Sequence, residues 1–355
     1  MMKKRILMCC SDRSVKGGMV TVLNNFLSYE NWNDFDIIYV PTHIEKTKVE
    51  LIIFFLKAYI KILFMSIFGK YDLAYLHMAE RGSVYRKGII ERTAKLFRKK
   101  VIIHHHSAEF DLFYNSISGS KKKFVDKTLE IADLNIVLSE NLVSMITNKV
   151  PNAKVDVLYN SVRTYEKKPY NPKGTGILFL GRLGERKGTF DLLLAIKQID
   201  EQIDEKYRFY LCGDGDIEGV KEKIKELKIE KRIAHVGWIE KKDKKRIYSN
   251  IIINVLPSYN EGLPMSILET MAYGIPSIST NIASIPEVVH DGENGYIIEP
   301  GDINSLAEKI LQLINDSQKR VNYSDNSWKL ISTEFSFNVQ MEKLKKILNR
   351  VLKEK

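Results

Sequence analysis

Cysteine is scarce in this sequence, with three residues among 355. Cys9, Cys10 and Cys212 all lie within apolar runs and cannot form a disulfide framework, so we expect a reducing, cytosolic compartment. The first residues, MMKKRILMCC, have no long apolar core and no small-residue cleavage site, so we expect no signal peptide. No repeat or low-complexity tract stands out. These features exclude small disulfide-stapled proteins and repeat proteins.

The composition is that of a globular protein, with 44% hydrophobic and 28% charged residues, and the length suits two domains. Positive charge is concentrated in the first half of the chain. Up to residue 167 there are 26 Lys and Arg against 17 Asp and Glu, which leaves 29 against 27 beyond it. This imbalance indicates an anionic membrane surface, a phosphorylated substrate or nucleic acid as a partner, or a basic surface that is merely solvated.

Short apolar runs alternate with helix-length segments along the whole chain, a pattern typical of parallel sheets flanked by helices. The first half has six such runs: RILMCC, FDIIYV, YDLAYLH, KVIIHHH, LNIVLS and VDVLYN. A stretch rich in Pro, Gly and Lys at residues 165–176 predicts a linker. Five further runs follow: GILFLGRL, YRFYLCGDG, IAHVGW, IIINVLPS and IPSIST. The sequence therefore predicts an α/β protein with two doubly wound Rossmann-like domains, residues 1–167 and 168–335, and a C-terminal helix at 336–355 that packs back toward the N-terminal domain.

Ligands of parallel sheets bind outside the carboxyl ends of the strands, where loops lead into helices. The loop GRLGERKG places Gly181, Arg182 and Lys187 at such a position, and an Arg with a Lys there would hold a diphosphate. The alternative is two surface cations in a glycine turn. SVKGGMV repeats the arrangement, so that the amides of Gly17 and Gly18 are candidates for contact with a phosphate or a reacting sugar.

Two polar clusters follow other strands. In CGDGD, Asp214 and Asp216 favour a turn and helix cap over a metal site. In KVIIHHH, strand alternation predicts that His104 and His106 share one face of the sheet and that His105 occupies the other. Tandem histidines can ligate metals, but no second cluster of His, Cys or Glu with suitable spacing lies nearby in the sequence. The histidines are therefore interpreted either as polar residues that cap the strand or, for His106, as a hydrogen-bonding group at the strand end.

NEGLPMSILETMAYGIP carries two carboxylates around the start of an apolar helix. Pro264 suits the first turn of that helix and Gly274 its end, which places Glu261 in the preceding loop and Glu269 within the helix. A carboxylate in an apolar helix is costly unless it is paired, and a pair of ribose hydroxyls would supply two donors to Glu269. Taken alone, the two carboxylates would also fit the acid/base pair of a hydrolase.

Five motifs in order, GRLGERKG, CGDGD, HVGWI, LPSYNEGLPMSILETMAYGIPSIST and IPEVVHDGENGYII, resemble those of the retaining glycosyltransferases of family 4, the glycosyl transferases group 1. The resemblance covers nearly the whole chain. It implies the GT-B fold, with the active site in the cleft between two Rossmann-like domains. It also implies retaining transfer of a hexose-type sugar from a nucleotide-diphosphate sugar to a saccharide or lipid-linked acceptor, without a cofactor or an obligatory metal, in bacterial surface polysaccharide synthesis.

The resemblance also implies roles for individual residues. Arg182 and Lys187 would neutralise the donor diphosphate, Glu261 would contact the transferred sugar, and Glu269 would bind the ribose. His106 would lie near the donor sugar and act in catalysis with Glu261, Arg182 and Lys187. The remaining residues expected to contact the donor are Gly17, Gly18, Gly181, Gly213, Asp214, Gly262 and Leu263. A GT-B-like epimerase or phosphorylase is the alternative, and no recognisable surface supports nucleic-acid binding.

The most apolar stretch, residues 51–72, is interrupted by Lys57 and Lys61, which argues against a transmembrane span. It is interpreted either as a helix packed on the sheet or as a helix that lies in a membrane interface with its lysines near lipid phosphates. The nearby basic clusters FRKK and SKKKF favour the second reading. We therefore expect a cytoplasmic enzyme that is peripheral on the inner face of the cell membrane.

Overall fold

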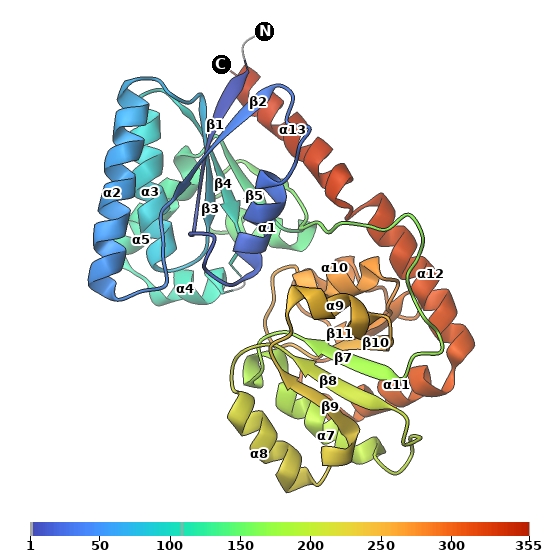
Figure 1. Cartoon of the computed structure of the whole chain (residues 1–355). Helices are drawn as coiled ribbons and strands as arrows, with labels where there is room; N and C mark the ends of the chain where they lie inside the picture. Colours follow the sequence, from blue (N-terminus) through green and yellow to red (C-terminus); the bar gives the residue numbers. More distant parts are fainter. Residues whose placement is uncertain (1–2, 108, 355) are drawn as a thin grey trace. The chain divides into compact units, whose positions relative to one another are not determined.

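The computed structural model describes residues 3–107 and 109–354 and divides into two compact units. The first unit comprises Met1–Asn160 and Gln340–Lys355, and the second unit comprises Ser161–Val339. Each unit is built around a six-stranded sheet in which every pairing is parallel (Figure 1). The prediction of two doubly wound α/β domains is thus confirmed.

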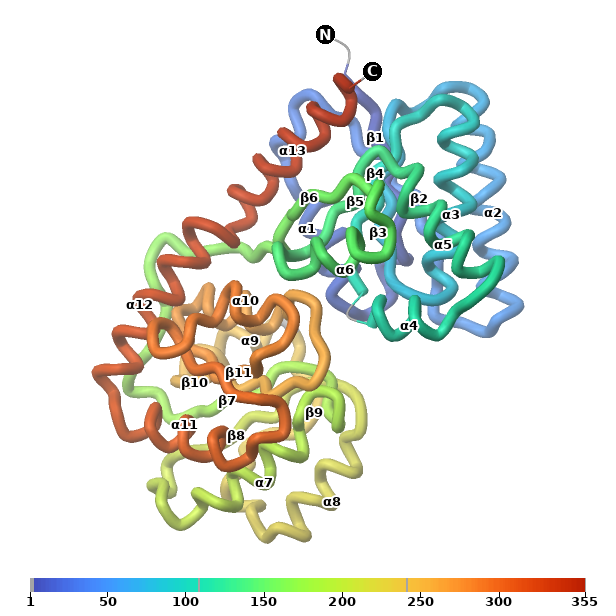
Figure 2. Tube along the Cα trace, turned by 180° about the vertical axis from the view of Figure 1, so that it is seen from behind, coloured from blue at the N-terminus to red at the C-terminus, as the bar shows by residue number. Residues whose placement is uncertain are grey.

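The sheet of the first unit has the strand order β2-β1-β3-β4-β5-β6. Its strands are β1 (Lys4–Cys10), β2 (Phe35–Pro41), β3 (Leu73–Met78), β4 (Lys100–His105), β5 (Leu134–Val137) and β6 (Val155–Val157). Its helices are α1 (Gly18–Leu27), α2 (Lys48–Ile67), α3 (Gly82–Leu96), α4 (Phe110–Ser116), α5 (Gly119–Ile131), η1 (Glu140–Leu142) and α6 (Val143–Thr147). Helices α2, α3 and α5 cover one face of the sheet, and α1 lies on the other (Figures 1 and 2).

The C-terminal helix α13 (Phe337–Lys353) belongs to the first unit from Gln340 onward. Its buried residues there are Met341, Leu344, Ile347, Leu348 and Val351, spaced at helical intervals along one side. The Tyr29 hydroxyl donates a 2.9 Å hydrogen bond to Glu342, and Arg350 forms an ion pair with Asp156. The last helix of the chain therefore buries its apolar side in the same unit as the first strands.

Helix α2 differs from an ordinary amphipathic helix, because its exposed face is apolar as well as its buried face. The helix begins with a capping box in which Thr47 and Glu50 bond each other's backbone. Ala58, Ile62 and Ser66 are its buried residues, one or two turns apart. The large apolar side chains that remain exposed are Val49, Ile52, Ile53, Leu56, Ile60, Phe64 and Ile67, with Phe68 directly after the helix. We call this set the α2 apolar face. No helix of the described residues is long and apolar enough to cross a membrane.

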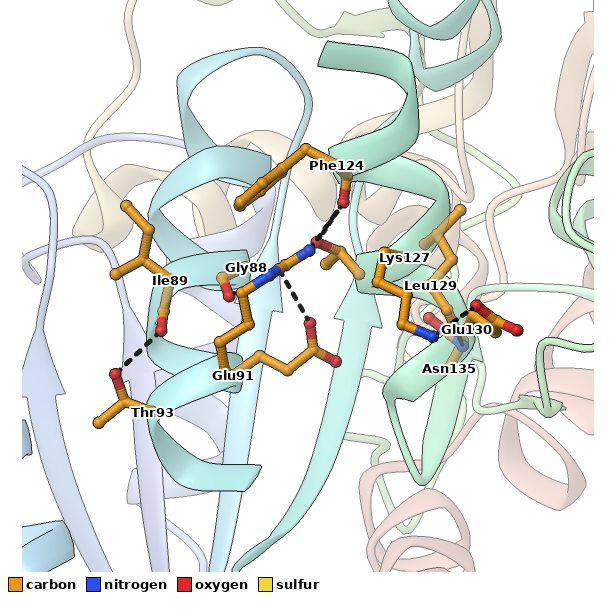
Figure 3. A network of polar contacts seen from close by, with 11 residues as sticks. Gly88, Ile89, Glu91, Thr93, Phe124, Lys127, Leu129, Glu130 and Asn135 are labelled. Atoms are coloured by element: carbon orange, nitrogen blue, oxygen red, sulfur yellow. Dashed lines mark hydrogen bonds and ion pairs between the residues drawn. The ribbon is translucent and has the colours of Figure 1, made fainter. Parts of the chain in front are cut away.

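A network of polar contacts lies between α3 and α5, with Gly88 and Glu91 on one side and Phe124 on the other (Figure 3). Arg92 donates to the carbonyl of Gly88 and to the Thr128 hydroxyl, each at 2.9 Å, and to the carbonyl of Phe124 at 3.1 Å. Its guanidinium also lies 3.9 Å from the centre of the Phe124 ring. Glu91 approaches Arg92 only to 3.8 Å, and its two fully buried oxygens accept no hydrogen bond from the described residues.

The sheet of the second unit has the strand order β12-β11-β10-β7-β8-β9. Its strands are β7 (Gly176–Leu180), β8 (Arg208–Cys212), β9 (Ile233–Gly237), β10 (Ile251–Leu256), β11 (Ser277–Thr280) and β12 (Gly295–Ile298). Its helices are η2 (Glu185–Lys187), α7 (Thr189–Ile199), α8 (Ile217–Leu227), η3 (Glu230–Arg232), α9 (Lys241–Tyr248), α10 (Met265–Ala272), η4 (Ile285–Glu287), α11 (Ile303–Asn315) and α12 (Ser317–Thr333). Helices α7, α8 and α11 lie on one face of the sheet, and α9 and α10 on the other (Figure 1).

The sequence predicts five strands in this half, whereas the structure has six. The additional strand, β12, is a four-residue edge strand that follows the turn DGENG. It is too short to show a strand period, and its pairing with β11 depends on residues far from it in sequence.

A buried ion pair fastens the end of α7 to η3, directly before β9. Arg232 is 2% exposed, and its Nε donates to Asp200 at 2.6 Å. Its other donors reach the carbonyls of Ile203 and Asp204, each at 2.9 Å. The guanidinium is therefore almost fully satisfied inside the unit, as a buried charge requires.

Candidate active site

Two loops at the carboxyl edge of the second sheet are held together by a close backbone approach. The loop after β7 contains η2, and the loop after β10 contains Pro257 and Tyr259. Gly188 has φ +67°, and a Cβ added there would lie 2.0 Å from the carbonyl oxygen of Pro257. The amide of Tyr259 donates a 2.9 Å hydrogen bond to the carbonyl of Arg186. Glycine is therefore required at this position both by conformation and by space.

This approach brings Lys187 to Glu261, so that two of the residues predicted for catalysis form an ion pair. The pair is mostly buried, with 13% of the Lys187 side chain and 7% of the Glu261 side chain exposed. Ser258 donates a 2.9 Å hydrogen bond to the same carboxylate oxygen, and the Ser258 carbonyl accepts one from Thr280 at 2.6 Å. Burial lowers the pKa of Lys187, although Glu261 acts in the opposite direction. The lysine is thus a desolvated cation with one carboxylate beside it.

The loops after β7 and β8 also meet at a glycine. A Cβ added at Gly213 would lie 1.8 Å from the carbonyl oxygen of Gly181, and the amide of Leu183 donates to the Asp214 carbonyl at 2.6 Å. Asp216 caps α8 by accepting a hydrogen bond from a backbone amide at 3.0 Å, which confirms the turn-and-cap interpretation for that residue. Arg182 is exposed at the start of its loop, at the end of β7.

Helix α10 begins and ends as the sequence predicts. Pro264 precedes its first residue and Gly274, at φ +76°, follows its C-terminal cap. Glu269 lies on this helix and accepts a 2.6 Å hydrogen bond from Lys244 of α9 and one of 3.4 Å from the Tyr248 hydroxyl. The Glu269 side chain remains 27% exposed, so its carboxylate is both held and reachable from solvent.

Gly262 and Leu263 lie in the loop that leads from β10 into α10. Gly262 is half-buried and Leu263 is buried at 3% exposure. They directly follow Glu261, so their position is set by the same loop that carries the ion pair with Lys187. The loop is therefore rigidly placed before α10.

Gly17, Gly18 and His106 belong to the first unit. Gly17 has φ +144°, is exposed, and would meet no atom within 4 Å if it carried a Cβ, while α1 begins at Gly18. The requirement for glycine at position 17 therefore comes from backbone conformation and not from crowding.

The three histidines at the end of β4 divide between the two faces of the sheet as predicted. The rings of His104 and His106 lie 4.1 Å apart. His105 instead contacts Asn135, with 3.1 Å between the ring nitrogen and the amide oxygen. His77, at the end of the neighbouring β3, pairs in register with His104, and its Nδ1 lies 2.9 Å from Nε2 of His106.

Four residues of these sites were not predicted. Lys244 and Tyr248 hold Glu269, Ser258 holds Glu261, and His77 contacts His106. Two of them left a signal in the sequence, because Ser258 lies within LPSYNEG and His77 ends the run YDLAYLH. Lys244 is one of four lysines in KKDKK, and only the packing of α9 against α10 distinguishes it from its neighbours.

Comparison with known proteins identifies the fold and the family. The model described as "Glycosyl transferases group 1" matches residues 162–329, nearly all of the second unit. An uncharacterized glycosyltransferase of Methanocaldococcus jannaschii is 30% identical over 252 residues, which cover 68% of this chain and 67% of that protein. The capsular polysaccharide biosynthesis glycosyltransferase CapM of Staphylococcus aureus is 31% identical over 181 residues, 50% of this chain and 46% of CapM.

A solved structure shares the fold over nearly the whole chain. HepE of Anabaena, determined in complex with UDP-glucose, superposes with a TM-score of 0.76 at 18% identity and covers 98% of this chain and 99% of that chain. At that identity the likeness establishes the GT-B fold. The sequence relatives and the matching family model show that this chain belongs to the glycosyl transferases group 1 and is a glycosyltransferase.

Proposed function

We propose that this glycosyltransferase retains anomeric configuration and moves a hexose-type sugar from a nucleotide-diphosphate sugar to a hydroxyl of a saccharide or lipid-linked acceptor. The observation that carries the proposal is the buried pair of Lys187 and Glu261 at the carboxyl edge of the second sheet. An exposed arginine, Arg182, lies in the same loop as the lysine. Parallel sheets bind phosphorylated ligands at this edge. HepE, which has the same fold, was determined in complex with UDP-glucose.

Departure of a nucleoside diphosphate leaves negative charge on the phosphate and positive character on the sugar. Fixed cations aimed at the phosphate each contribute about 2–4 kcal/mol to transition-state stabilisation, by analogy with oxyanion-hole donors. The partly desolvated Lys187 is suited to this role because its charge is weakly screened. Glu261 then orients the lysine and the sugar, and the leaving phosphate accepts the proton of the acceptor hydroxyl on the same face. Neither step requires a metal ion.

Glu269 would bind the ribose of the donor. Lys244 and Tyr248 both bond Oε2 of its carboxylate, which keeps the side chain in one orientation. Two adjacent hydroxyls can donate to one carboxylate, and charge-assisted hydrogen bonds of this kind are the strong ones. Arg182 and Lys187 would therefore bind the diphosphate of the donor, and Glu269 would bind its nucleoside.

A screen of donors tests the proposal. We expect one of UDP-, GDP-, ADP- or dTDP-sugars to raise the melting temperature of the protein without added metal and to release its nucleoside diphosphate slowly. Lys187→Met should slow the release by about 10²–10³-fold, whereas Lys221→Met, a change of an exposed lysine on α8, should leave it intact. Turnover of a sugar nucleotide into an epimer, or into sugar phosphate with inorganic phosphate, would replace the transferase by one of its rivals. Absence of any response would overturn the donor class.

The acceptor is proposed to be membrane-bound, in surface polysaccharide synthesis, with the protein peripheral on the cytoplasmic face of the membrane. CapM, a relative, acts in capsular polysaccharide biosynthesis. The α2 apolar face exposes 50% of Leu56, 53% of Ile60 and 56% of Phe64, one turn apart. Contiguous apolar surface of this kind marks an interaction site. Lys57 and Lys61 lie beside it, exposed, where they would meet lipid phosphates.

Vesicle flotation tests the membrane surface. The protein should float with phosphatidylglycerol vesicles and bind phosphatidylcholine vesicles more weakly. The double variant Leu56→Glu/Ile60→Glu should lose binding, because carboxylates placed on the apolar face oppose insertion. A variant with the same change of charge at exposed positions of the second unit, Gln198→Glu/Gln202→Glu, should float normally. Equal flotation of both variants would show that α2 is not the attachment surface.

A further inference from the structure

Three histidines form a compact cluster on one face of the first sheet. His77 is the penultimate residue of β3. His104 and His106 lie two residues apart where β4 ends. Because His77 and His104 are register partners on paired strands, their backbone positions are fixed by the ladder between β3 and β4. One ring nitrogen of each histidine lies within 4.8 Å of the other two. Three imidazoles thus converge on one small volume.

Two nitrogens of this cluster have no hydrogen-bond partner among the described residues. His77 and His104 are 0% and 1% exposed, and the Nε2 atom of each is buried and unpaired. An unpaired buried polar atom costs about 1–3 kcal/mol, so each such atom calls for an explanation. Three further nitrogens are engaged, since the Tyr75 hydroxyl lies 2.8 Å from Nδ1 of His104 and Nδ1 of His77 lies 2.9 Å from Nε2 of His106.

We propose that His77, His104 and His106 bind a transition-metal dication such as Zn²⁺. Imidazole nitrogen is the ligand that Zn²⁺, Ni²⁺ and Cu²⁺ favour, whereas Mg²⁺ and Ca²⁺ prefer oxygen. Three histidines with a fourth position for solvent are an established donor set for Zn²⁺. His106 is half-buried, so the cluster can be reached from the surface on its side.

The surroundings hold one ring of the cluster in a fixed orientation. Tyr75 orients His104 through the nitrogen that does not face the cluster, which is how outer groups commonly fix a ligating imidazole.

The transfer reaction proposed above needs no metal, but the cluster shares His106 with it. Glu261, Glu269 and Lys187 belong to the second unit, and the histidine cluster belongs to the first. Its metal would stabilise the ends of β3 and β4 and would occupy His106, the histidine that the family resemblance places near the donor sugar.

Cobalt titration of tag-free protein tests the proposal directly. We expect one Co²⁺ per chain, with the visible absorption of a tetrahedral nitrogen-ligated site, displaced by Zn²⁺ and not by Mg²⁺. His77→Gln and His106→Gln should each weaken binding by about tenfold or more, and Tyr75→Phe by about 10–100-fold. His105→Gln, on the opposite face of the same strand, is the matched control and should bind as the wild type does.

Nitrogen-detected NMR of histidine-labelled wild-type protein gives a second readout that needs no variant. Zn²⁺ should shift the ring resonances of His77, His104 and His106 together and leave His235 and His290 of the second unit unchanged. Failure of the wild type to bind Co²⁺ at millimolar concentration would overturn the proposal. Binding that survives both His77→Gln and His106→Gln, or shifts confined to other histidines, would do the same.

Discussion

Replacement of Glu91 by glutamine should make the first unit more stable, by an amount that grows with pH. Burial raises the pKa of the Glu91 carboxyl from 4.5 to about 9, and Arg92 at 3.8 Å offsets only part of this effect. The native state therefore keeps a proton on Glu91 that the unfolded state has already lost at neutral pH. Between pH 4.5 and pH 9 the native state binds more protons than the unfolded state, so the stability of the wild type falls as pH rises.

The magnitude follows from the two pKa values. Each pH unit above the unfolded value costs about 1.4 kcal/mol, so the penalty reaches about 3 kcal/mol at pH 7. No allowance for solvent screening is needed, because the Glu91 side chain is fully buried. Glutamine has no proton to lose and is free of the penalty at every pH. Its amide introduces donors beside atoms that lack partners, but that cost does not depend on pH.

Urea unfolding followed by the fluorescence of Trp32 measures this difference. Trp32 is buried in the first unit, and a background of Trp238→Phe and Trp328→Phe removes the two tryptophans of the second unit. The stability of Glu91→Gln minus that of Glu91 should rise by about 1.4 kcal/mol per pH unit from about pH 5 to pH 8. Glu130→Gln, a change of a partly exposed acid on α5, should show no such slope. A Glu91→Gln difference that stays constant over this range would refute the reasoning.

Three further outcomes are expected. Lys187→Met should lower kcat by about 10²–10³-fold with a smaller change in the donor KM, measured by release of nucleoside diphosphate; an effect on KM alone would contradict a role in the transition state. Glu269→Gln should raise the donor KM by about tenfold or more, since it weakens charged hydrogen bonds, and unchanged donor affinity in a thermal-shift titration would exclude ribose binding. Arg232→Met leaves the Asp200 carboxylate buried without its guanidinium and should destabilise the second unit by about 3–5 kcal/mol in urea unfolding, whereas Lys231→Met, at an exposed lysine, should not.

The sequence was sufficient for most of the fold because parallel strands are buried on both faces. All six residues of β3 and all six of β10 are buried, so these strands read as continuous apolar runs bounded by loops. β12 was missed because four residues carry no period, and its position at the edge is decided by pairing with β11. Strand alternation also placed His104 and His106 on one face, which the structure confirms.

The local structure around the candidate site was predictable from the sequence, but the pairings between its residues were not. Pro264 and Gly274 mark the limits of α10 through local conformational preferences, and these can be read from sequence. The partnership of Lys187 with Glu261 joins residues 74 positions apart and depends on the contact of Gly188 with Pro257. Lys244 reaches Glu269 because of the packing of α9 beside α10. Contacts of this kind are set by tertiary structure, which no local pattern encodes.

The two crowded glycines limit how the donor preference of this enzyme can be engineered. A single added methyl at Gly188 or Gly213 would lie within 2.0 Å of a neighbouring carbonyl oxygen, so every library member with a side chain there displaces a loop of the site. Mutagenesis aimed at new sugar nucleotides should therefore hold these two positions constant. Diversity belongs instead at Asp214 and Gly262, which are half-buried and lie in loops of the same edge.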